Sequence, residues 1–239
     1  MKRLMASVAL LALTATGAYA DDNEIHVFQL GFGNSSTNVQ DGTNQSIATE
    51  TSPFAQIGID NVADFTQTGF PGLGGGGQDH ILTDGVEVSG QFGSNNTATI
   101  DQFGHRHVIN RVLQFGDGNE MTILQENEDQ TLTNLEQRGV GNAMTITQHD
   151  SDQTGTAEQF GFGNTMEVVQ EGGFNSFDIQ QGVFDEGQPN FGGSVTALQS
   201  GFGNDLEVRQ AGGPGHVVVS NQIGFGLSAT MHQGYTPAP

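Results

Sequence analysis

Side-chain amides recur at fixed intervals along this 239-residue chain. The stretch QFGFGN at 159–164 returns as QLGFGN at 29–34 and as QSGFGN at 199–204. A carboxamide is neither a nucleophile nor a base near neutral pH, but it donates and accepts hydrogen bonds at the same time. The chemistry that this spacing favours is therefore hydrogen bonding between identical side chains.

The repeat extends through almost the whole chain. Alignment on Q-x-G gives eight copies, whose starts are separated by 27, 35, 23, 23, 22, 40 and 23 residues. The first Gln of each copy is Gln29, Gln56, Gln91, Gln114, Gln137, Gln159, Gln199 or Gln222. A second Gln follows eleven residues later: Gln40, Gln67, Gln102, Gln125, Gln148, Gln170, Gln210 and Gln233.

Two further positions recur between these glutamines. A Gly lies two residues after the first Gln: Gly31, Gly58, Gly93, Gly116, Gly139, Gly161, Gly201 and Gly224. An Asn lies five residues after it in seven copies, and Leu227 replaces it in the eighth: Asn34, Asn61, Asn96, Asn119, Asn142, Asn164 and Asn204. The same residue at the same offset is what a stacked arrangement needs, because an unpaired buried amide costs roughly 1–3 kcal/mol.

The residues between the markers alternate in polarity. In the fourth copy Met121, Ile123 and Gln125 share one parity, and Glu120 and Thr122 share the other. Period two predicts strands with one face turned inward. The residue four after the first Gln predicts a chain reversal at positive φ, which Gly, Asp and Asn adopt at low cost. These residues are Gly33, Asp60, Asn95, Gly118, Gly141, Gly163, Gly203 and Gly226.

Each copy therefore predicts strand, turn, strand, turn. One such unit cannot bury its inward face alone, but stacked copies can. We expect an all-β protein, a β-solenoid of about eight stacked strand-turn-strand repeats of the cross-β, amyloid type. The repeated Gln and Asn would form ladders along its axis, and the Gly would let the backbone turn tightly.

Composition outside the repeat predicts four segments. Lys2 and Arg3, the apolar stretch LMASVALLALTATG and the sequence Ala18-Tyr19-Ala20 indicate a signal peptide over 1–20. A membrane anchor is the alternative, but the apolar run is shorter than the roughly 18 residues of a spanning helix. A short N-terminal segment would follow over 21–28, then the repeat domain over 29–235 with insertions near 68–90 and 182–194, then a Pro-rich tail over 236–239. A secreted protein with no membrane span is expected.

Charge and cysteine content limit the partners. Past residue 20 the chain keeps four arginines, no lysine and 27 acidic residues. Repulsion from phosphates argues against nucleic acid and anionic lipid surfaces as partners. The chain has no cysteine, so no disulfide supports the fold.

Two stretches offer other chemistry. GGGGQDHIL at 74–82 fits the nonapeptide of calcium-binding β-rolls, but those sites need consecutive copies and only one is present. His105 and His107 share one strand parity, and a surface histidine pair is the simpler interpretation than a metal site. Neither a metal nor a cofactor is expected. An enzyme is not expected either, since no nucleophile with a nearby base recurs.

With these offsets repeated eight times behind a signal peptide, residues 25–235 resemble the curlin repeat of curli fibre subunits. The resemblance implies a self-polymerising structural subunit of an extracellular functional amyloid, for surface adhesion and biofilm matrix. It further implies a nucleator subunit and a Gram-negative outer-membrane secretion channel as partners. Major subunit and nucleator both remain open, with the former favoured. The alternative is a soluble, capped β-solenoid adhesin or carbohydrate-binding protein that does not polymerise.

Overall fold

A computed structural model describes residues 23–42, 44–69, 80–82, 88–182, 190–211 and 213–234. These residues form strands joined by turns, and no helix occurs among them. The expected signal peptide at 1–20, residues 74–79 of the calcium-like stretch and the tail at 236–239 lie outside the described residues.

The strands form two parallel sheets. Sheet A contains one row of strands stacked through the repeated glutamines: β2 (Val27–Phe32), β5 (Phe54–Ile59), β8 (Gly90–Ser94), β11 (Val112–Asp117), β13 (Thr131–Val140), β15 (Thr154–Phe162), β17 (Ser176–Gln181), β20 (Asp205–Gln210) and β23 (Ser228–Gln233). Short strands extend sheet A: β1 (Glu24–Ile25), β4 (Gln45–Ile47), β7 (His80–Leu82), β10 (Val108–Ile109), β18 (Asn190–Phe191) and β21 (Gly213–Pro214). Sheet B contains β3 (Ser35–Asp41), β6 (Val62–Gly69), β9 (Thr97–His105), β12 (Glu120–Glu128), β14 (Ala143–Ser151), β16 (Thr165–Gly173), β19 (Ser194–Phe202) and β22 (Val217–Phe225).

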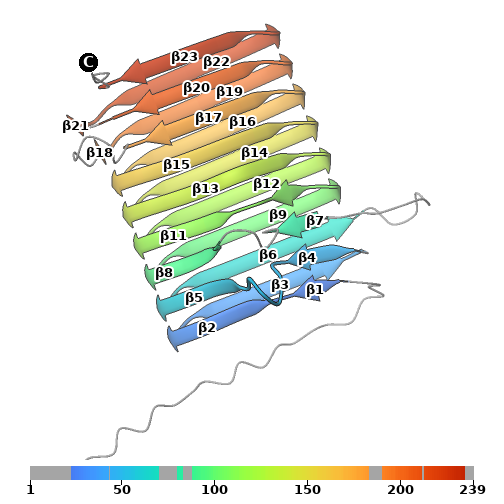
Figure 1. The fold of residues 1–239 in the computed structure, drawn as a ribbon. Coiled ribbons are helices and arrows are strands. Elements are labelled where there is room, and N and C mark those ends of the chain that lie inside the picture. The colour runs from blue at the N-terminus through green and yellow to red at the C-terminus, as the bar shows by residue number, and fades with distance from the viewer. Residues whose placement is uncertain are drawn as a thin grey trace, which may run out of the picture.

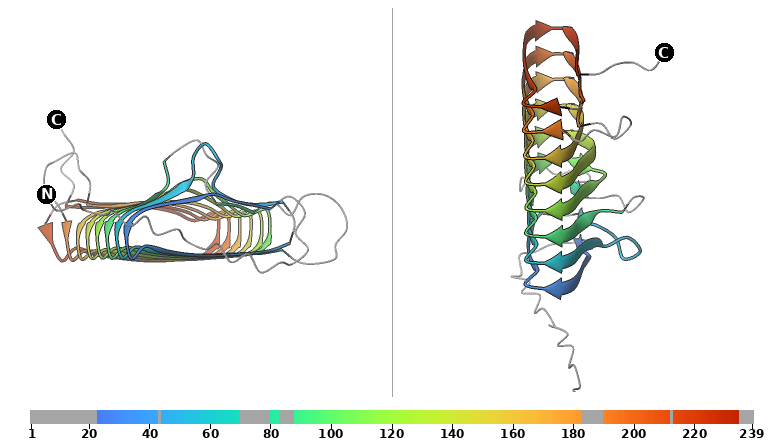
Figure 2. Two further views of the ribbon diagram at one scale, coloured as in Figure 1. Left: turned by 90° about the horizontal axis from the view of Figure 1, so that it is seen from below. Right: turned by 90° about the vertical axis from the view of Figure 1, so that its left-hand side faces the viewer.

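The chain alternates between the two sheets and climbs by one strand spacing per turn. Figure 1 shows the resulting column, from β1 and β2 at the blue end to β22 and β23 at the red end. Seen along the column, each turn is a flat loop in which the two sheets face one another (Figure 2). The predicted all-β solenoid of about eight turns is confirmed.

The interior between the sheets is narrow and built from columns of like residues. Met121 and Ile123, predicted to point inward, are 0% and 1% exposed. Their register partners in the next turn of sheet B are Met144 and Ile146. Near the N-terminal end Phe54 of sheet A meets Phe65 of sheet B edge to face, with ring centroids 4.9 Å apart. Identical apolar side chains therefore stack along the axis, as period-two patterning requires.

The predicted chain reversals are also confirmed. All eight residues expected at positive φ adopt it, with φ between 54° at Asp60 and 68° at Gly33. The chain thus reverses at positions where Gly, Asp or Asn adopts a left-handed backbone conformation at low energetic cost.

The expected eight equivalent copies are not equivalent in space, which corrects the sequence alignment. The first Gln lies in sheet A in the six copies up to Gln159, but in sheet B at Gln199 and Gln222. The 40-residue interval contains an additional strand of sheet A, β17, which puts the following copies out of phase by half a turn. The physical reason is that each copy contains two similar strands ending in Gln, and either strand satisfies the ladder of either sheet.

Segments expected to lie outside the repeat also join the stack. β1 and the start of β2 fall within the short N-terminal segment predicted at 21–28, and β1 pairs with β4. β7 falls within the insertion predicted near 68–90, and it pairs with both β4 and β10. The start of β19 and all of β18 fall within 182–194. β7 and β18 therefore extend sheet A, and β19 belongs to sheet B.

Candidate functional site: amide ladders and open strand edges

Glutamines in sheet A form an unbroken chain of side-chain hydrogen bonds. Each Nε2 donates to Oε1 of the Gln one turn further on, at 2.5 to 3.2 Å. The members are Gln29, Gln56, Gln91, Gln114, Gln137, Gln159, Gln181, Gln210 and Gln233. Gln181 was not among the predicted ladder residues. Its signal in the sequence is Asn175, six residues before it, just as Asn204 lies six before Gln210.

Sheet B carries a second ladder of the same kind. Its donor-acceptor distances lie between 2.7 and 2.9 Å. The members are Gln40, Gln67, Gln102, Gln125, Gln148, Gln170, Gln199 and Gln222. Together the two ladders contain every glutamine that the repeat predicted.

Apart from Gln29, Gln40 and Gln233 at the ends, the ladder glutamines are deeply buried and hydrogen-bonded. Gln114 is 0% exposed, and its Nε2 also donates to the carbonyl oxygens of Thr97 at 2.9 Å and Asn119 at 3.2 Å. Its Oε1 accepts from Gln91 at 2.8 Å. The amide therefore ties neighbouring turns and both sheets together, which offsets the cost of burying it.

Asparagines form a third ladder at the corner where sheet A turns into sheet B. In each step both the backbone N–H and Nδ2 of one Asn donate to Oδ1 of the previous Asn, at 3.0 to 3.2 Å. The members are Asn34, Asn61, Asn96, Asn119, Asn142 and Asn164. The next turn has Gly193, whose backbone N–H donates to Asn164 at 2.9 Å, so the side-chain ladder stops there.

Asn204 was predicted to continue that ladder and instead lies at the opposite corner. Its backbone N–H donates to Oδ1 of Asn175 at 3.0 Å, and the N–H of Leu227 donates to Asn204 at 3.1 Å. The correction follows from the half-turn phase change at β17. This opposite corner, where sheet B turns into sheet A, holds Asn23, Gln45, His80, His107, Gln130, Gln153, Asn175, Asn204 and Leu227.

His107 is thus not part of a surface pair, as the sequence suggested. It is 0% exposed and stacks on His80, with ring centroids 5.0 Å apart. Burial lowers the pKa of each ring from 6.5 to about 4, and in His80 the charge of His107 lowers it further. Both rings are therefore neutral at pH 7. A sequence signal existed, since His107 lies five residues after Gln102, as Gln130 and Gln153 follow Gln125 and Gln148.

The repeated spacing of Gly within the chain reflects close contact between turns. At Gly116 φ is +126°, and an added Cβ would lie 1.9 Å from the carbonyl oxygen of Gly139. Gly31, Gly58, Gly93 and Gly139 repeat this geometry, each against the carbonyl oxygen of the glycine one turn further on. Any side chain here would push two turns of the ladder apart.

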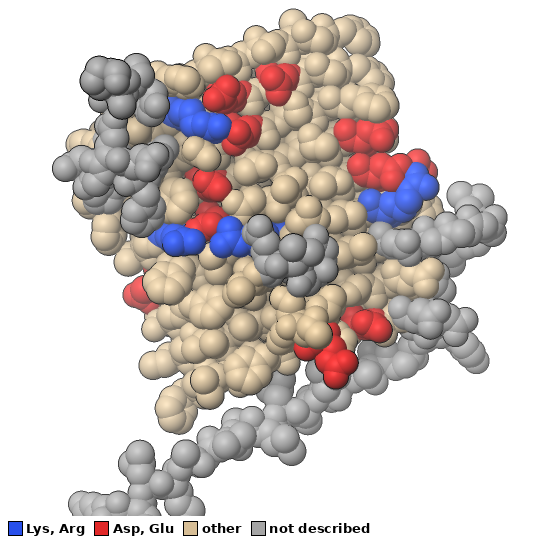
Figure 3. Space-filling view, in the orientation of Figure 1, with Lys and Arg blue, Asp and Glu red and all other residues tan. Residues whose placement is uncertain are grey.

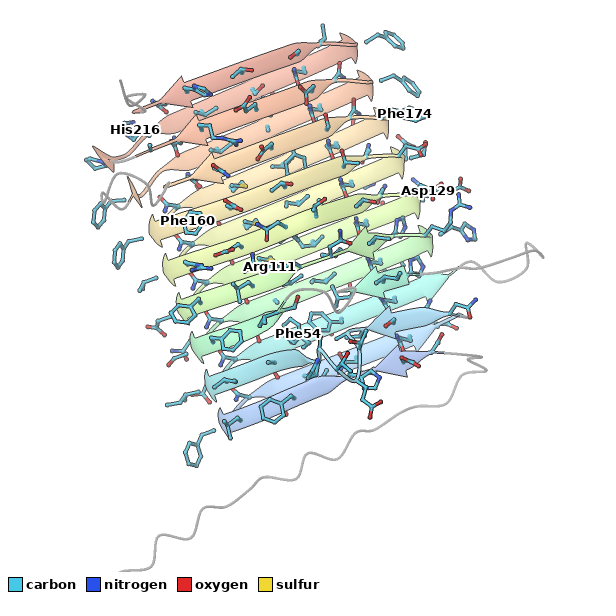
Figure 4. The ribbon with its side chains drawn as sticks, viewed as in Figure 1. Phe54, Arg111, Asp129, Phe160, Phe174 and His216 are labelled. Carbon is cyan, nitrogen blue, oxygen red and sulfur yellow. The ribbon has the colours of Figure 1, made fainter. Side chains whose placement is uncertain are left out.

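Charges gather on the outer face of sheet A, toward the C-terminal half. Arg111 donates to Glu136 at 2.6 Å and to Asn134 at 2.8 Å, and Arg209 donates to Asp178 at 2.6 Å. Burial, with the neighbouring Glu136, raises the pKa of Glu158. Figure 3 shows this acidic column between arginines, with a larger uncharged area toward β2. Arg111 lies over this face and Asp129 at its edge (Figure 4).

Phenylalanines stack in pairs at the corners of the column. Phe162 packs on Phe191 with ring centroids 5.2 Å apart, and Phe202 packs on Phe225 at 5.8 Å. These pairs follow the same one-turn spacing as the ladders.

Both ends of the column leave strand edges without a partner strand in the described chain. β1, β2 and β3 are the last strands at the N-terminal end, and β21, β22 and β23 at the C-terminal end. The ladders reach these edges: they end at the partly exposed Gln29 and Gln40 at one end, and at the partly exposed Gln233 and the buried Gln222 at the other. Unpaired edges carrying a repeated pattern are templates for further strands.

No cluster of three or more potential metal ligands occurs among the described residues. Within the same residues, no helix is long and apolar enough to cross a membrane. His80 of the calcium-like stretch is buried in the corner column, and the stretch before it lies outside the described residues. Comparison of the chain with family models, curated proteins and solved structures found no match.

Proposed function

We propose that the protein is the structural subunit of an extracellular functional amyloid fibre of the curli type. The observation that carries the proposal is the continuity of both glutamine ladders up to both ends of the column. An amide ladder gains one hydrogen bond for each added layer, and a terminal Gln at each end offers that bond to another copy.

The resemblance to curlin repeats supplies the rest of the proposal. The subunit is secreted and serves surface adhesion and the biofilm matrix. Its partners are further copies of itself, a nucleator subunit and an outer-membrane secretion channel. The major-subunit role fits the chain better than the nucleator role, since the last copy carries no basic cluster. No catalytic role belongs to this proposal.

The test uses purified residues 21–239 at near-neutral pH. Thioflavin fluorescence should rise after a lag, and the product should give a meridional reflection at about 4.7–4.8 Å, the spacing of stacked strands. A protein that stays monomeric, with β-type circular dichroism and no rise in thioflavin fluorescence, would contradict the proposal.

One observation favours a second candidate, a capped solenoid adhesin. The asparagine columns end before the C-terminal edge, at Gly193 in one corner and at Leu227 in the other. The C-terminal end therefore offers fewer amides than the N-terminal end, which retains Asn23 and Asn34. A stable monomer would direct the next experiment to glycan binding.

A further inference from the structure

The column has an odd number of half-turns. The ladder row of sheet A has nine strands, from β2 to β23, whereas sheet B has eight, from β3 to β22. The described stack therefore starts and finishes in sheet A. This parity decides how a second copy can join it.

A second copy that places its sheet A on sheet A and its sheet B on sheet B cannot continue both sheets while β23 stays in place. If β2 of the second copy were added on β23, β3 of that copy would lie two strand positions beyond β22 in sheet B, because β2 and β3 belong to the same turn. The position directly on β22 would stay empty. Sheet B would then lack one strand at every joint. The gap would expose buried ladder groups of Gln222 and interrupt one of the two glutamine ladders.

Removal of β23 makes the two ends complementary. The strand that an incoming copy would meet in sheet A is then β20. The N-terminal stretch 23–29, NEIHVFQ, matches 204–210, NDLEVRQ, more closely than the present occupant 227–233, LSATMHQ, does. Ile25 would lie over Leu206, Val27 over Val208 and Gln29 over Gln210 in the register of β20 and β23.

The corner residue improves in the same exchange. Leu227 offers only its backbone N–H to Oδ1 of Asn204, at 3.1 Å. Asn23 would occupy this position and offer both a backbone N–H and a side-chain amide, which are the two donors that each Asn–Asn pair of the other corner uses. A ladder that ends at Leu227 within one copy would thus continue into the next.

Sheet B provides an independent match. The inward residue two before the ladder Gln is apolar in the six interior turns, from Phe65 to Ala197, and polar only at the two ends, as Asn38 and Ser220. Oδ1 of Asn38 is buried without a hydrogen-bond partner. When β3 lies on β22 with Gln40 over Gln222, Asn38 meets the hydroxyl of Ser220, a donor for that oxygen.

We propose that copies join head to tail by strand exchange, in which β1 and β2 of one copy displace β23 of the next and take its place on β20. β3 then lies directly on β22, and both sheets run on without a gap. β23 is accordingly a removable cover over the growing edge. This inference rests on the proposed fibre function and specifies the geometry of its joint.

Disulfide trapping in assembled fibres tests the joint, because the chain has no cysteine of its own. Thr37→Cys and Val219→Cys, in separate copies mixed before assembly, place outward-facing thiols side by side only if β3 lies on β22. Phe28→Cys and His232→Cys place them side by side only if β23 is retained under β2. Neighbouring residues in paired strands fall within the Cα separation of a disulfide. Thr99→Cys with Thr122→Cys in one chain, which are register partners, is the positive control.

Strand exchange predicts at least about tenfold more oxidised dimer from the first pair than from the second. The fraction of thiol oxidised in the first pair should approach that in the positive control. Fibres in which the second pair dominates, or in which neither pair reacts while the control does, would overturn the exchange and leave the fibre function standing. Absence of any fibre from all variants and from the unmodified protein would overturn both.

Discussion

Gln170 donates through Nε2 to Oε1 of Gln199 at 2.8 Å, although Gln170 closes one copy of the sequence motif and Gln199 opens another. The two residues occupy the same column because the intervening β17 adds half a turn to sheet A. The ladder thus requires a glutamine at the right height, whichever part of the motif supplies it. This tolerance lets the column continue through irregular spacing.

Replacement of Gln114 by Leu should destabilise the column. The substitution removes a donor from Gln137 Oε1 and from the carbonyl of Thr97, and an acceptor from Gln91. Each buried group left unpaired costs about 1–3 kcal/mol. Urea unfolding should show a fall in the free energy of unfolding of that order or more. Gln180→Leu, on the outward side of β17, is the matched control and should change it by less than about 0.5 kcal/mol. Equal effects of the two would refute a structural role for the ladder.

Gly116 and Gly118 offer a paired test of close contact between turns. Gly116→Ala should strongly destabilise the protein, since its Cβ would lie 1.9 Å from a backbone oxygen of Gly139. Gly118 also has positive φ, 63°, but an added Cβ meets nothing within 4 Å. Gly118→Ala should therefore cost only about 1–2 kcal/mol, for the left-handed backbone. Thermal unfolding followed by circular dichroism compares the two, and similar melting temperatures would contradict the contact.

The buried histidines predict a loss of stability in acid. His80 and His107 have a pKa of about 4 in the folded protein and about 6.5 when unfolded. The titratable side chains nearest to His107 are His80, Asp129 and His105. Between pH 6.5 and 4 the unfolded chain binds protons that the folded chain does not. The free energy of unfolding should therefore be independent of these groups above pH 6.5. It should fall below that pH by up to about 1.4 kcal/mol per pH unit for each ring.

Urea unfolding at pH 7.5 and pH 5 measures this dependence. The double variant His80→Gln, His107→Gln should lose most of it, because an amide does not titrate in this range. His232→Gln, on the exposed strand β23, should keep it. An unchanged pH dependence in the double variant would exclude the pair as its source.

Acidic charge should slow assembly at neutral pH. The formal net charge of the whole chain is −21. In the exchanged joint Glu24 would lie over Asp205, so like charges meet where copies join. Salt should shorten the lag, since the Debye length falls from about 30 Å at 0.01 M to about 8 Å at 0.15 M ionic strength. Glu24→Gln should weaken this salt effect more than Glu120→Gln does on an interior strand. Lag times that change neither with salt nor with Glu24→Gln would argue against charge repulsion at the joint.

Removal of residues 228–239 should accelerate assembly. The shortened chain lacks β23, so β20 and β22 form an open edge with an even number of half-turns. Thioflavin kinetics should show a shorter lag or faster elongation than for residues 21–239. Removal of 235–239 alone keeps β23 and is the control. A longer lag in the shorter chain, with its β-type circular dichroism intact, would argue that β23 supports growth.

Much of the column could be predicted because its signals are local. Alternation places Met121, Ile123 and Gln125 inward whatever the rest of the chain does. Gly, Asp or Asn at the fourth residue of each turn predicts positive φ for a purely local reason. The phase of the copies after Gln170 was not predictable in this way, since β17 resembles a strand of either sheet. The burial of His107 was not predicted, because it depends on stacking against His80, which lies 27 residues earlier in the chain.

The sequence by itself thus determined the two strands of each copy, their inward faces, the turns and the two ladder glutamines of each copy, since each depends on spacing of a few residues. Only the tertiary structure decided which strand lies on which. It showed that Gln181 joins the sheet A ladder, that Asn204 lies in the second corner and that the column ends half a turn out of phase. Those facts depend on the number of half-turns accumulated along the chain, and identical strands carry no local record of that number.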